Sequence, residues 1–137
     1  MELTSDLDNK CLLLFPLNNN QDPESAGGSH WTLLVFSMVT KTFHHLDSSE
    51  GFNDPEARMF SSKLSQYFKV TPKLMRTNVT QQSNGWACGD HCLYNLDQAA
   101  SLCVGGQDID TWSVSDTSSG VKKIRPDLLN LIRSLKG

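Results

Sequence analysis

Cys88 is the residue whose type and position point most directly to chemistry. It lies in "QQSNGWACGDHCLYNLDQAA" (81–100), where a polar loop gives way to an apolar run that predicts a helix beginning at Cys88. The unpaired N–H groups and the dipole at a helix N-terminus stabilise a thiolate, and Gly89 lets a substrate approach the backbone closely. Cys88 is therefore either a nucleophile or a small buried thiol. For Cys92 and Cys103, which recur along the apolar face of the helix, we favour the buried thiol.

A cysteine nucleophile needs a base and a group that orients this base. His30 begins one strand of a predicted hairpin, and Asp47 lies near the end of the other. If the turn is centred between Met38 and Val39, His30 lies opposite Asp47, within reach of a carboxylate that fixes the imidazole tautomer. His91 is the rival base, three residues after the cysteine, but it has no equally placed acid.

A zinc site is the alternative chemistry for these residue types. Cys88, His91 and Cys92 lie close together in the sequence, but there is no Cys-x-x-Cys unit and no second pair of ligands at a matching distance. We therefore expect no metal ion. Of the other histidines, His45 shares a strand face with the predicted acid and stays a minor rival as the base, and His44 is expected to be an ordinary strand residue.

Gln82 is the candidate for stabilising an oxyanion. It lies six residues before Cys88 in a turn-rich loop, where its side-chain amide can reach the same carbonyl oxygen as the Cys88 backbone N–H. A solvated loop amide is the alternative interpretation.

The elements that must position these side chains can be predicted from hydrophobic periodicity and turn residues. Residues 1–10 are polar and acidic and are expected to be loose. Asn53 or Asp54, followed by Pro55, predicts a helix start. We expect one α+β domain, spanning 1–137, in which a small antiparallel sheet is flanked by helices. The predicted strands are 11–18, 30–38, 42–48 and 73–81, and the predicted helices run from Asn53 to Lys69, from Cys88 to Gly105 and from near Pro126 onward.

The composition is that of an ordinary globular protein. The 137 residues are 38% hydrophobic and 20% charged, with a formal net charge of -3. This charge argues against nucleic acid as a partner, and we interpret Lys122, Lys123 and Arg125 as a solvated turn. No apolar run is long enough for a membrane span. We expect a cytoplasmic or nuclear, reducing location, in which all four cysteines are free thiols.

The candidate residues occur together in stretches that resemble the Ulp/sentrin-specific cysteine protease family. The matching stretches are "LFPLNNN", "GGSHWTLLVF", "HLDSSEG" and "QQSNGWACGDHCLYNL", which cover roughly residues 12 to 100. The resemblance implies a papain-like, Ulp-type cysteine protease core without a cofactor. It implies His30 as base, Asp47 as orienting acid, Cys88 as nucleophile and Gln82 as oxyanion donor. Trp31, with Gly89 and Trp86, is implied to line the substrate channel.

The implied activity is a thiol protease or isopeptidase that cleaves after the C-terminal Gly-Gly of a ubiquitin-like modifier. "SAGGSHWTLLV" is most similar to the deneddylase branch, so the NEDD modifier is favoured as the partner and SUMO comes next. The implied reactions are precursor processing and release of the modifier from its protein conjugates.

The sequence departs from the family pattern in two places. Ala87 precedes the cysteine where the family has Asp. About ten polar residues stand where the family has a helical and strand segment before "LFPLN", so we expect a domain truncated at its N-terminus with weakened modifier binding. The alternative function is a catalytically weak or inactive modifier-binding remnant of such a protease.

Overall fold

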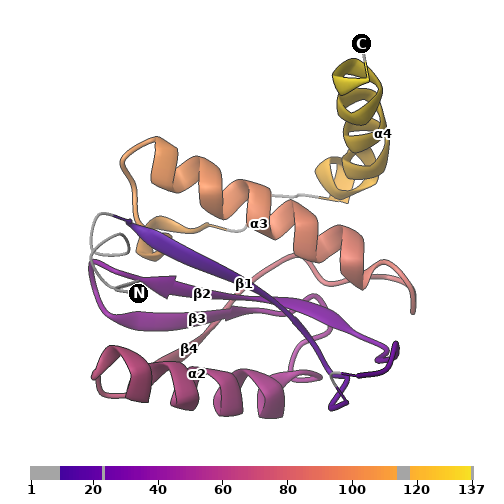
Figure 1. Ribbon diagram of the computed structural model, residues 1–137. Coiled ribbons are helices and arrows are strands. Elements are labelled where there is room, and N and C mark those ends of the chain that lie inside the picture. Colours follow the sequence, from indigo (N-terminus) through magenta and orange to yellow (C-terminus); the bar gives the residue numbers. More distant parts are fainter. Residues whose placement is uncertain (1–9, 23, 114–117, 137) are drawn as a thin grey trace.

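A computed structural model describes residues 10–22, 24–113 and 118–136 of the chain. Four strands form one sheet in the order β1-β2-β3-β4, and their bounds are Leu12–Asn18, Trp31–Ser37, Thr42–Leu46 and Leu74–Thr77. Helix α2 (Asp54–Phe68) covers one face of the sheet, and helix α3 (Cys88–Val104) lies across the other (Figure 1). The predicted α+β class is therefore confirmed. The predicted loose segment 1–10 lies, except for Lys10, outside the described residues.

Alternation along β2 explains why both faces of the sheet are covered. Leu33 and Val35 point to the α3 side, where they pack with Cys92 and Ala99. Leu34 and Phe36 belong to the second core cluster on the α2 side. All four β2 side chains are fully buried. A strand covered on both faces is apolar at successive positions rather than at alternate ones, as "LLVF" is.

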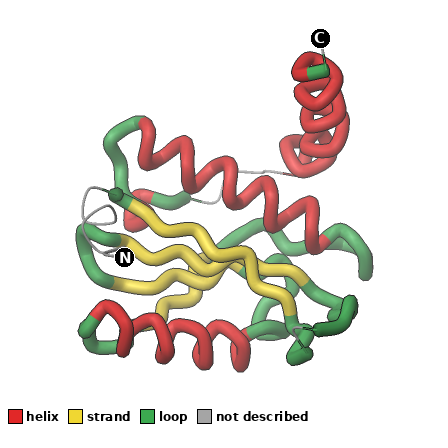
Figure 2. Tube along the Cα trace, in the orientation of Figure 1, coloured by secondary structure: helices red, strands yellow, loops and turns green. Residues whose placement is uncertain are grey.

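The sheet is mixed rather than wholly antiparallel. β1, β2 and β3 are antiparallel neighbours, as predicted, whereas β4 joins β3 in the parallel direction. This direction follows from the connection, because α2 crosses the sheet between β3 and β4 (Figure 2). The register of the hairpin also differs from the prediction. Leu33 pairs with Leu46, since the turn is centred one residue later than the junction of Met38 and Val39.

Helix α4 (Ser118–Leu135) begins eight residues before Pro126, where the sequence had predicted its start. Pro126 lies inside the helix, and the basic cluster interpreted as a solvated turn is helical. Packing explains the earlier start: Val121 is buried, and a Cβ atom on Gly120 would collide with the ring of Tyr94 on α3. The first turns of α4 are thus held on α3, while its C-terminal part extends away from the sheet (Figure 1).

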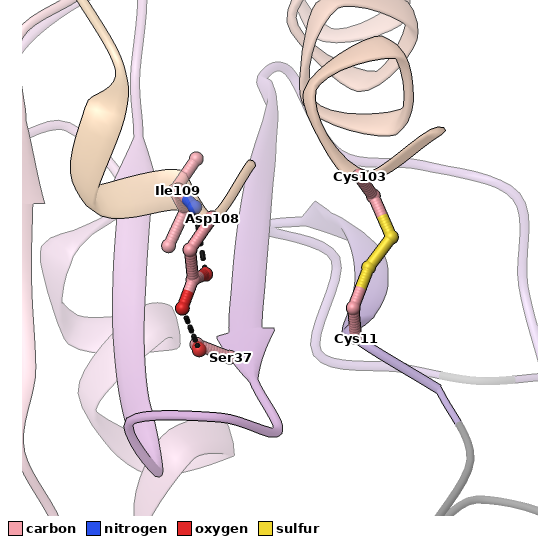
Figure 3. Close-up of a disulfide and its surroundings, with 5 residues drawn as sticks. All are labelled: Cys11, Ser37, Cys103, Asp108 and Ile109. Atoms are coloured by element: carbon pink, nitrogen blue, oxygen red, sulfur yellow. Dashed lines mark hydrogen bonds between the residues drawn. A yellow bond between two sulfur atoms is a disulfide. The ribbon is translucent and has the colours of Figure 1, made fainter. Parts of the chain in front are cut away.

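A disulfide joins Cys11, just before β1, to Cys103, near the end of α3 (Figure 3). The prediction that all four cysteines are free thiols is therefore wrong for this pair, and Cys88 and Cys92 are free. Sequence could not predict the bond, because only the packing of α3 across β1 brings two cysteines 92 positions apart to a Cα–Cα distance of 6.3 Å.

None of the helices in the described part of the chain has the length and apolar character needed to cross a membrane.

Candidate active site

A buried histidine–carboxylate pair lies at the end of the sheet where β2 begins and β3 ends. Nε2 of His30 lies 2.6 Å from Oδ1 of Asp47, and both side chains are almost wholly excluded from solvent. The two residues do not face each other in the ladder, as the predicted register required. They meet because His30 lies one residue before β2 and Asp47 lies one residue after β3, at the same end of the two strands.

The Asp47 carboxylate accepts hydrogen bonds at both oxygens. Oδ1 accepts from the Ser49 N–H at 2.8 Å as well as from His30, and Oδ2 accepts from the Asn53 N–H at 3.1 Å. The carboxylate is thus fixed on Nε2 of His30, and Nδ1, which has no hydrogen-bond partner among the described residues, is the nitrogen left for proton transfer.

The loop that precedes His30 is held by the asparagines at the end of β1 and directly after it. Asn19 Oδ1 accepts from the N–H groups of Ser29 and His30, at 2.7 and 3.2 Å. Gly28 has a φ of 85°, and a Cβ atom there would overlap the Asn18 side chain. These residues fix the backbone that enters the histidine.

Cys88 is the first residue of α3, as predicted, and its side chain is 7% exposed. Its Sγ lies 4.0 Å from the carbonyl oxygen of Ser29, the residue before His30, so the helix start lies beside the histidine–carboxylate pair. The first intrahelical bond runs from the His91 N–H to the Ala87 carbonyl. The N–H groups of the first turn therefore precede any intrahelical acceptor and can stabilise negative charge at the thiol or on a bound carbonyl.

Cys92, one turn further along α3, lies in a different environment. Its Sγ donates to the Thr32 carbonyl at 3.2 Å, and burial, together with the nearby Cys88, raises the pKa of the Cys92 thiol to about 12. A thiol with this pKa stays protonated at neutral pH and is a poor nucleophile. Cys92 is accordingly the buried thiol that the sequence favoured.

The rival histidines lack the geometry of His30. His44 and His45 lie on β3, where their hydrogen-bond partners include Thr42 and Thr32. His91 lies on α3, and burial lowers its pKa. Its imidazole has no hydrogen-bond partner in the described structure.

Gln82 lies near the site and is hydrogen-bonded to Ser48, the residue after Asp47. Its backbone N–H donates to the Ser48 carbonyl at 2.8 Å, and its Oε1 accepts from the Ser48 hydroxyl at 2.7 Å. Its Nε2 donates to the Asn84 carbonyl at 2.7 Å. A primary amide has two N–H donors, so one donor remains for an oxyanion. The role of Gln82 in stabilising an oxyanion stays a prediction.

The residues predicted to contact substrate are partly or largely exposed. Trp31 is 44% and Trp86 66% exposed, and a Cβ atom on Gly89 would meet no atom within 4 Å. The Arg125 guanidinium lies 5.7 Å from the centroid of the Trp86 ring and pairs with Asp90 at 2.7 Å. Behind the loop, a cavity of about 380 Å³ lies between the Thr80–His91 region and α4.

The structure does not assemble the candidate zinc ligands Cys88, His91 and Cys92 into a site. In the residues it describes, one group of side chains has ligand atoms within 4.8 Å of one another, namely His45, Asp47 and Asp54. Each of the three already has protein hydrogen-bond partners, so the group is accounted for as part of a polar network.

Several residues that hold the site were missed in the sequence. Ser48 and Gln81 tie the Gln82 loop to the end of β3, since Gln81 Nε2 donates to the Asp47 carbonyl at 3.0 Å. Asn53 was interpreted as a helix cap, but its side chain makes no capping bond. Asn53 lies six residues after the predicted acid, at the other end of a short loop, and this proximity is the signal that could have identified it.

No protein-family profile matches the chain. Curated relatives include NEDD8-specific protease 1 of Arabidopsis thaliana, which is 33% identical over 93% of this chain and 57% of the relative. Probable sentrin-specific protease 8 of Dictyostelium discoideum is 32% identical over 72% of this chain and 44% of the relative, and sentrin-specific protease 8 of Homo sapiens is 31% identical over 72% and 46%. The chain spans about half the length of the curated relatives it matches.

Solved structures share the fold. SUMO protease Ulp1, with its catalytic cysteine oxidised to a sulfenic acid, matches 90% of this chain and 55% of its own with a TM-score of 0.59 and 19% identity. A de-sumoylating protease matches 98% of this chain and 63% of its own with a TM-score of 0.52 and 17% identity. The Ulp-type fold predicted from the sequence is confirmed.

Proposed function

Because the chain belongs to the Ulp/sentrin-specific cysteine protease family, we propose that it is a cysteine-type peptidase that cleaves after the C-terminal Gly-Gly of a ubiquitin-like modifier. The observation that carries this proposal is the buried 2.6 Å pair of His30 and Asp47 beside the helix that begins at Cys88. A base oriented by a carboxylate and a thiol at a helix N-terminus form the arrangement that acyl transfer needs.

The reaction begins when Nδ1 of His30 takes the thiol proton and the Cys88 thiolate attacks the carbonyl carbon of the terminal glycine. The N–H groups of the first turn of α3 and the free amide N–H of Gln82 stabilise the oxyanion. The imidazolium then protonates the leaving amine, and the C–N bond breaks to give a thioester. Water, deprotonated by His30, attacks the thioester and releases the modifier as a carboxylate with restoration of the thiol. Asp47 keeps Nδ1 directed at the reacting atoms throughout.

Glycines at the end of the substrate fit the approach to this nucleophile. Trp31 lies at the start of β2 directly after His30, and Trp86 lies two residues before Cys88. We propose that the two rings flank the substrate; a chain between them must be narrow, and glycine, which has no side chain, is the narrowest residue. We assign Trp31, Trp86 and Gly89 to substrate binding on this ground.

NEDD8 is the modifier that we favour as substrate, with SUMO next. The relatives that cover most of this chain include NEDD8-specific protease 1 of Arabidopsis thaliana and of Schizosaccharomyces pombe. Comparing the rates at which the chain processes the two precursors tests this preference. Faster cleavage of the SUMO precursor would overturn the preference and leave the peptidase assignment in place.

The peptidase assignment is tested with NEDD8 and SUMO whose C-terminus carries an electrophile. We expect the wild-type chain to form a covalent adduct and Cys88→Ala to lose both the adduct and precursor cleavage. Cys92→Ala is the matched control, since it removes a thiol one turn away, and it should keep labelling largely intact. An adduct on Cys92, or labelling that survives in Cys88→Ala, would show that the nucleophile is assigned wrongly.

A modifier-binding protein without useful activity is the second candidate function. It is favoured by one observation, that Ala87 precedes Cys88 where the family has Asp. Such a protein would bind unmodified NEDD8 or SUMO but would form no adduct with the electrophilic probe, so the two candidates give different results in the same experiment.

We also propose a cytoplasmic or nuclear location, on the ground that ubiquitin-like modifiers are conjugated there. These compartments are reducing, so the location also predicts that in the cell the Cys11–Cys103 disulfide of the structure is reduced. Fluorescence microscopy of the tagged protein, with mass spectrometry of the Cys11 and Cys103 thiols after rapid alkylation, checks the proposal. Retention in a secretory compartment would contradict it.

A further inference from the structure

Asn53 lies immediately before α2 and is fully buried, yet its side chain does not cap the helix. Its Nδ2 instead lies 3.3 Å from the carbonyl oxygen of His30 and 3.4 Å from Oγ1 of Thr32. Its backbone N–H donates to Oδ2 of Asp47. One residue therefore contacts both members of the histidine–carboxylate pair, the acid through its main chain and the strand that carries the base through its side chain.

From this contact pattern, and resting on the proposed function, we propose that Asn53 is a positioning residue for the His30–Asp47 pair. The segment from Asp47 to Asn53 supplies both backbone N–H groups that hold the carboxylate, those of Ser49 and Asn53. The Asn53 amide fastens this segment to β2. Without it the carboxylate is free to rotate away from Nε2 of His30, and the base loses the partner that fixes its tautomer and stabilises its charged form.

A directed chain of hydrogen bonds fixes the amide itself. The Asn53 amide donates to Oγ1 of Thr32, the Thr32 hydroxyl donates to Nε2 of His45 at 2.9 Å, and Nδ1 of His45 donates to Oδ1 of Asp54 at 3.2 Å. Arg76 closes the chain with an ion pair to Asp54. Every donor in this sequence has an acceptor when His45 is neutral, and burial lowers the pKa of His45, which keeps it neutral.

The unused atom of Asn53 agrees with a positioning role. Its Oδ1 is buried and has no hydrogen-bond partner in the described residues. An unpaired buried oxygen lowers stability. The presence of an amide at position 53 is therefore explained by the contacts of its Nδ2 group, since its Oδ1 contributes no hydrogen bond.

The test measures the pH dependence with which iodoacetamide alkylates Cys88, read by mass spectrometry of the Cys88 peptide, in the wild-type chain and in Asn53→Ala. Alkylation reports the thiolate and the imidazolium together and needs no modifier. We expect the rate at neutral pH to fall about tenfold to a hundredfold and the pH profile to change, because the base is displaced from the thiol. If the chain also cleaves a modifier, kcat should fall while KM changes little.

Ser65→Ala is the matched control, since Ser65 is equally buried, donates at 2.7 Å to the Ser61 carbonyl within α2 and does not contact the pair. It should lower the midpoint of thermal unfolding without moving the alkylation profile. If Asn53→Ala fails to fold, Thr32→Val replaces it. This change keeps the shape of the side chain but removes the hydroxyl that accepts from the Asn53 amide. We expect a smaller fall in the alkylation rate of Cys88. An unchanged alkylation profile in the folded variant would overturn the proposal. A chain that cleaves neither modifier would refute the proposed function and leave this comparison valid.

Discussion

The two halves of the site are held in different ways. The acid–base half, formed by His30, Asp47 and Asn53, is buried, and its hydrogen bonds link two strands to the start of α2. The nucleophile half, formed by the loop 82–87 and Cys88, is tied to Ser48 at Gln82, and the middle of its loop is held by short-range contacts. Asn84 Oδ1 accepts from the N–H groups of Trp86 and Ala87 at 3.1 and 2.8 Å.

This difference in support matches the different tasks of the base and the nucleophile. A base must keep one tautomer and one direction through two proton transfers, which requires a rigid, buried surround. The nucleophile half must admit a polypeptide tail and enclose it, so its aromatic side chain at Trp86 stays open to solvent. We therefore expect changes in the acid–base half to affect every reaction of Cys88, and changes in the loop to affect only reactions that form an oxyanion.

The largest effect is expected for Asp47→Asn. Both carboxylate oxygens accept hydrogen bonds, so an amide at this position must turn its NH2 group toward a donor, either the Asn53 N–H or the His30 and Ser49 N–H groups. The imidazolium also loses its counter-charge. We expect kcat/KM for modifier cleavage to fall by roughly 10³ to 10⁴.

Glu50→Gln is the control for Asp47→Asn, because Glu50 is an exposed acid of the same loop whose partner is Arg76. Steady-state kinetics should show little change in this variant. A fall of less than tenfold in Asp47→Asn would mean that Asp47 does not orient the base and that the acid–base half is not the rigid element.

Local patterns were enough to predict that His30 and Asp47 would lie together and that Cys88 would begin a helix, and long-range packing explains what could not be predicted. The helix start at Cys88 and the pairing of His30 with Asp47 follow from a short motif and from two adjacent strands. The role of Asn53 depends on where α2 docks against β2. The Cys11–Cys103 bond and the first turns of α4 likewise depend on the packing of α3 against distant segments.

The hairpin register shows the same limit. His30 and Asp47 meet although the predicted alignment was wrong by two residues, since a four-residue turn replaced the tighter one that the sequence suggested. The ends of two adjacent strands lie close together even when the pairing register shifts by a residue or two. A site built from strand ends was therefore predictable before the strand pairing was.

A smaller effect is expected for Gln82→Ala. Loss of one oxyanion donor should lower kcat for modifier cleavage by about 10² to 10³. Alkylation of Cys88 by iodoacetamide passes through no oxyanion, so its rate should not change. Parallel measurements of the two reactions separate the loop from the acid–base half.

Gln81→Ala provides the neighbouring control for Gln82→Ala. Gln81 donates to the Asp47 carbonyl and accepts from the Glu50 N–H at 2.9 Å, so its role is to hold the loop. It should lower thermal stability more than it lowers kcat. If kcat falls more in Gln81→Ala than in Gln82→Ala, the oxyanion donor is Gln81 and the assignment of Gln82 is refuted.

The smallest effect concerns stability and compares two buried histidines: His45, which is linked through Thr32 to the acid–base half, and His91, which lies one turn after Cys88. Burial lowers the pKa of both His45 and His91 below the usual 6.5. Below about pH 6.5 the unfolded chain therefore binds more protons than the folded chain. The free energy of unfolding must fall as the pH drops from about 6.5 toward the lowered pKa values, and it must be independent of these groups at pH 8.

Substitution with glutamine distinguishes the two environments. His91→Gln should flatten the decline between pH 8 and pH 5.5 at little cost at pH 8, because the imidazole of His91 has no hydrogen-bond partner in the described residues. His45→Gln should also flatten it but should cost about 1–3 kcal/mol at pH 8, because Thr32 and Asp54 lose a buried partner. Urea unfolding at the two pH values measures both quantities. His44, whose pKa burial also lowers, leaves a residual slope in each variant. Equal losses at pH 8 would show that the two halves of the site are held equally tightly, against the comparison made above.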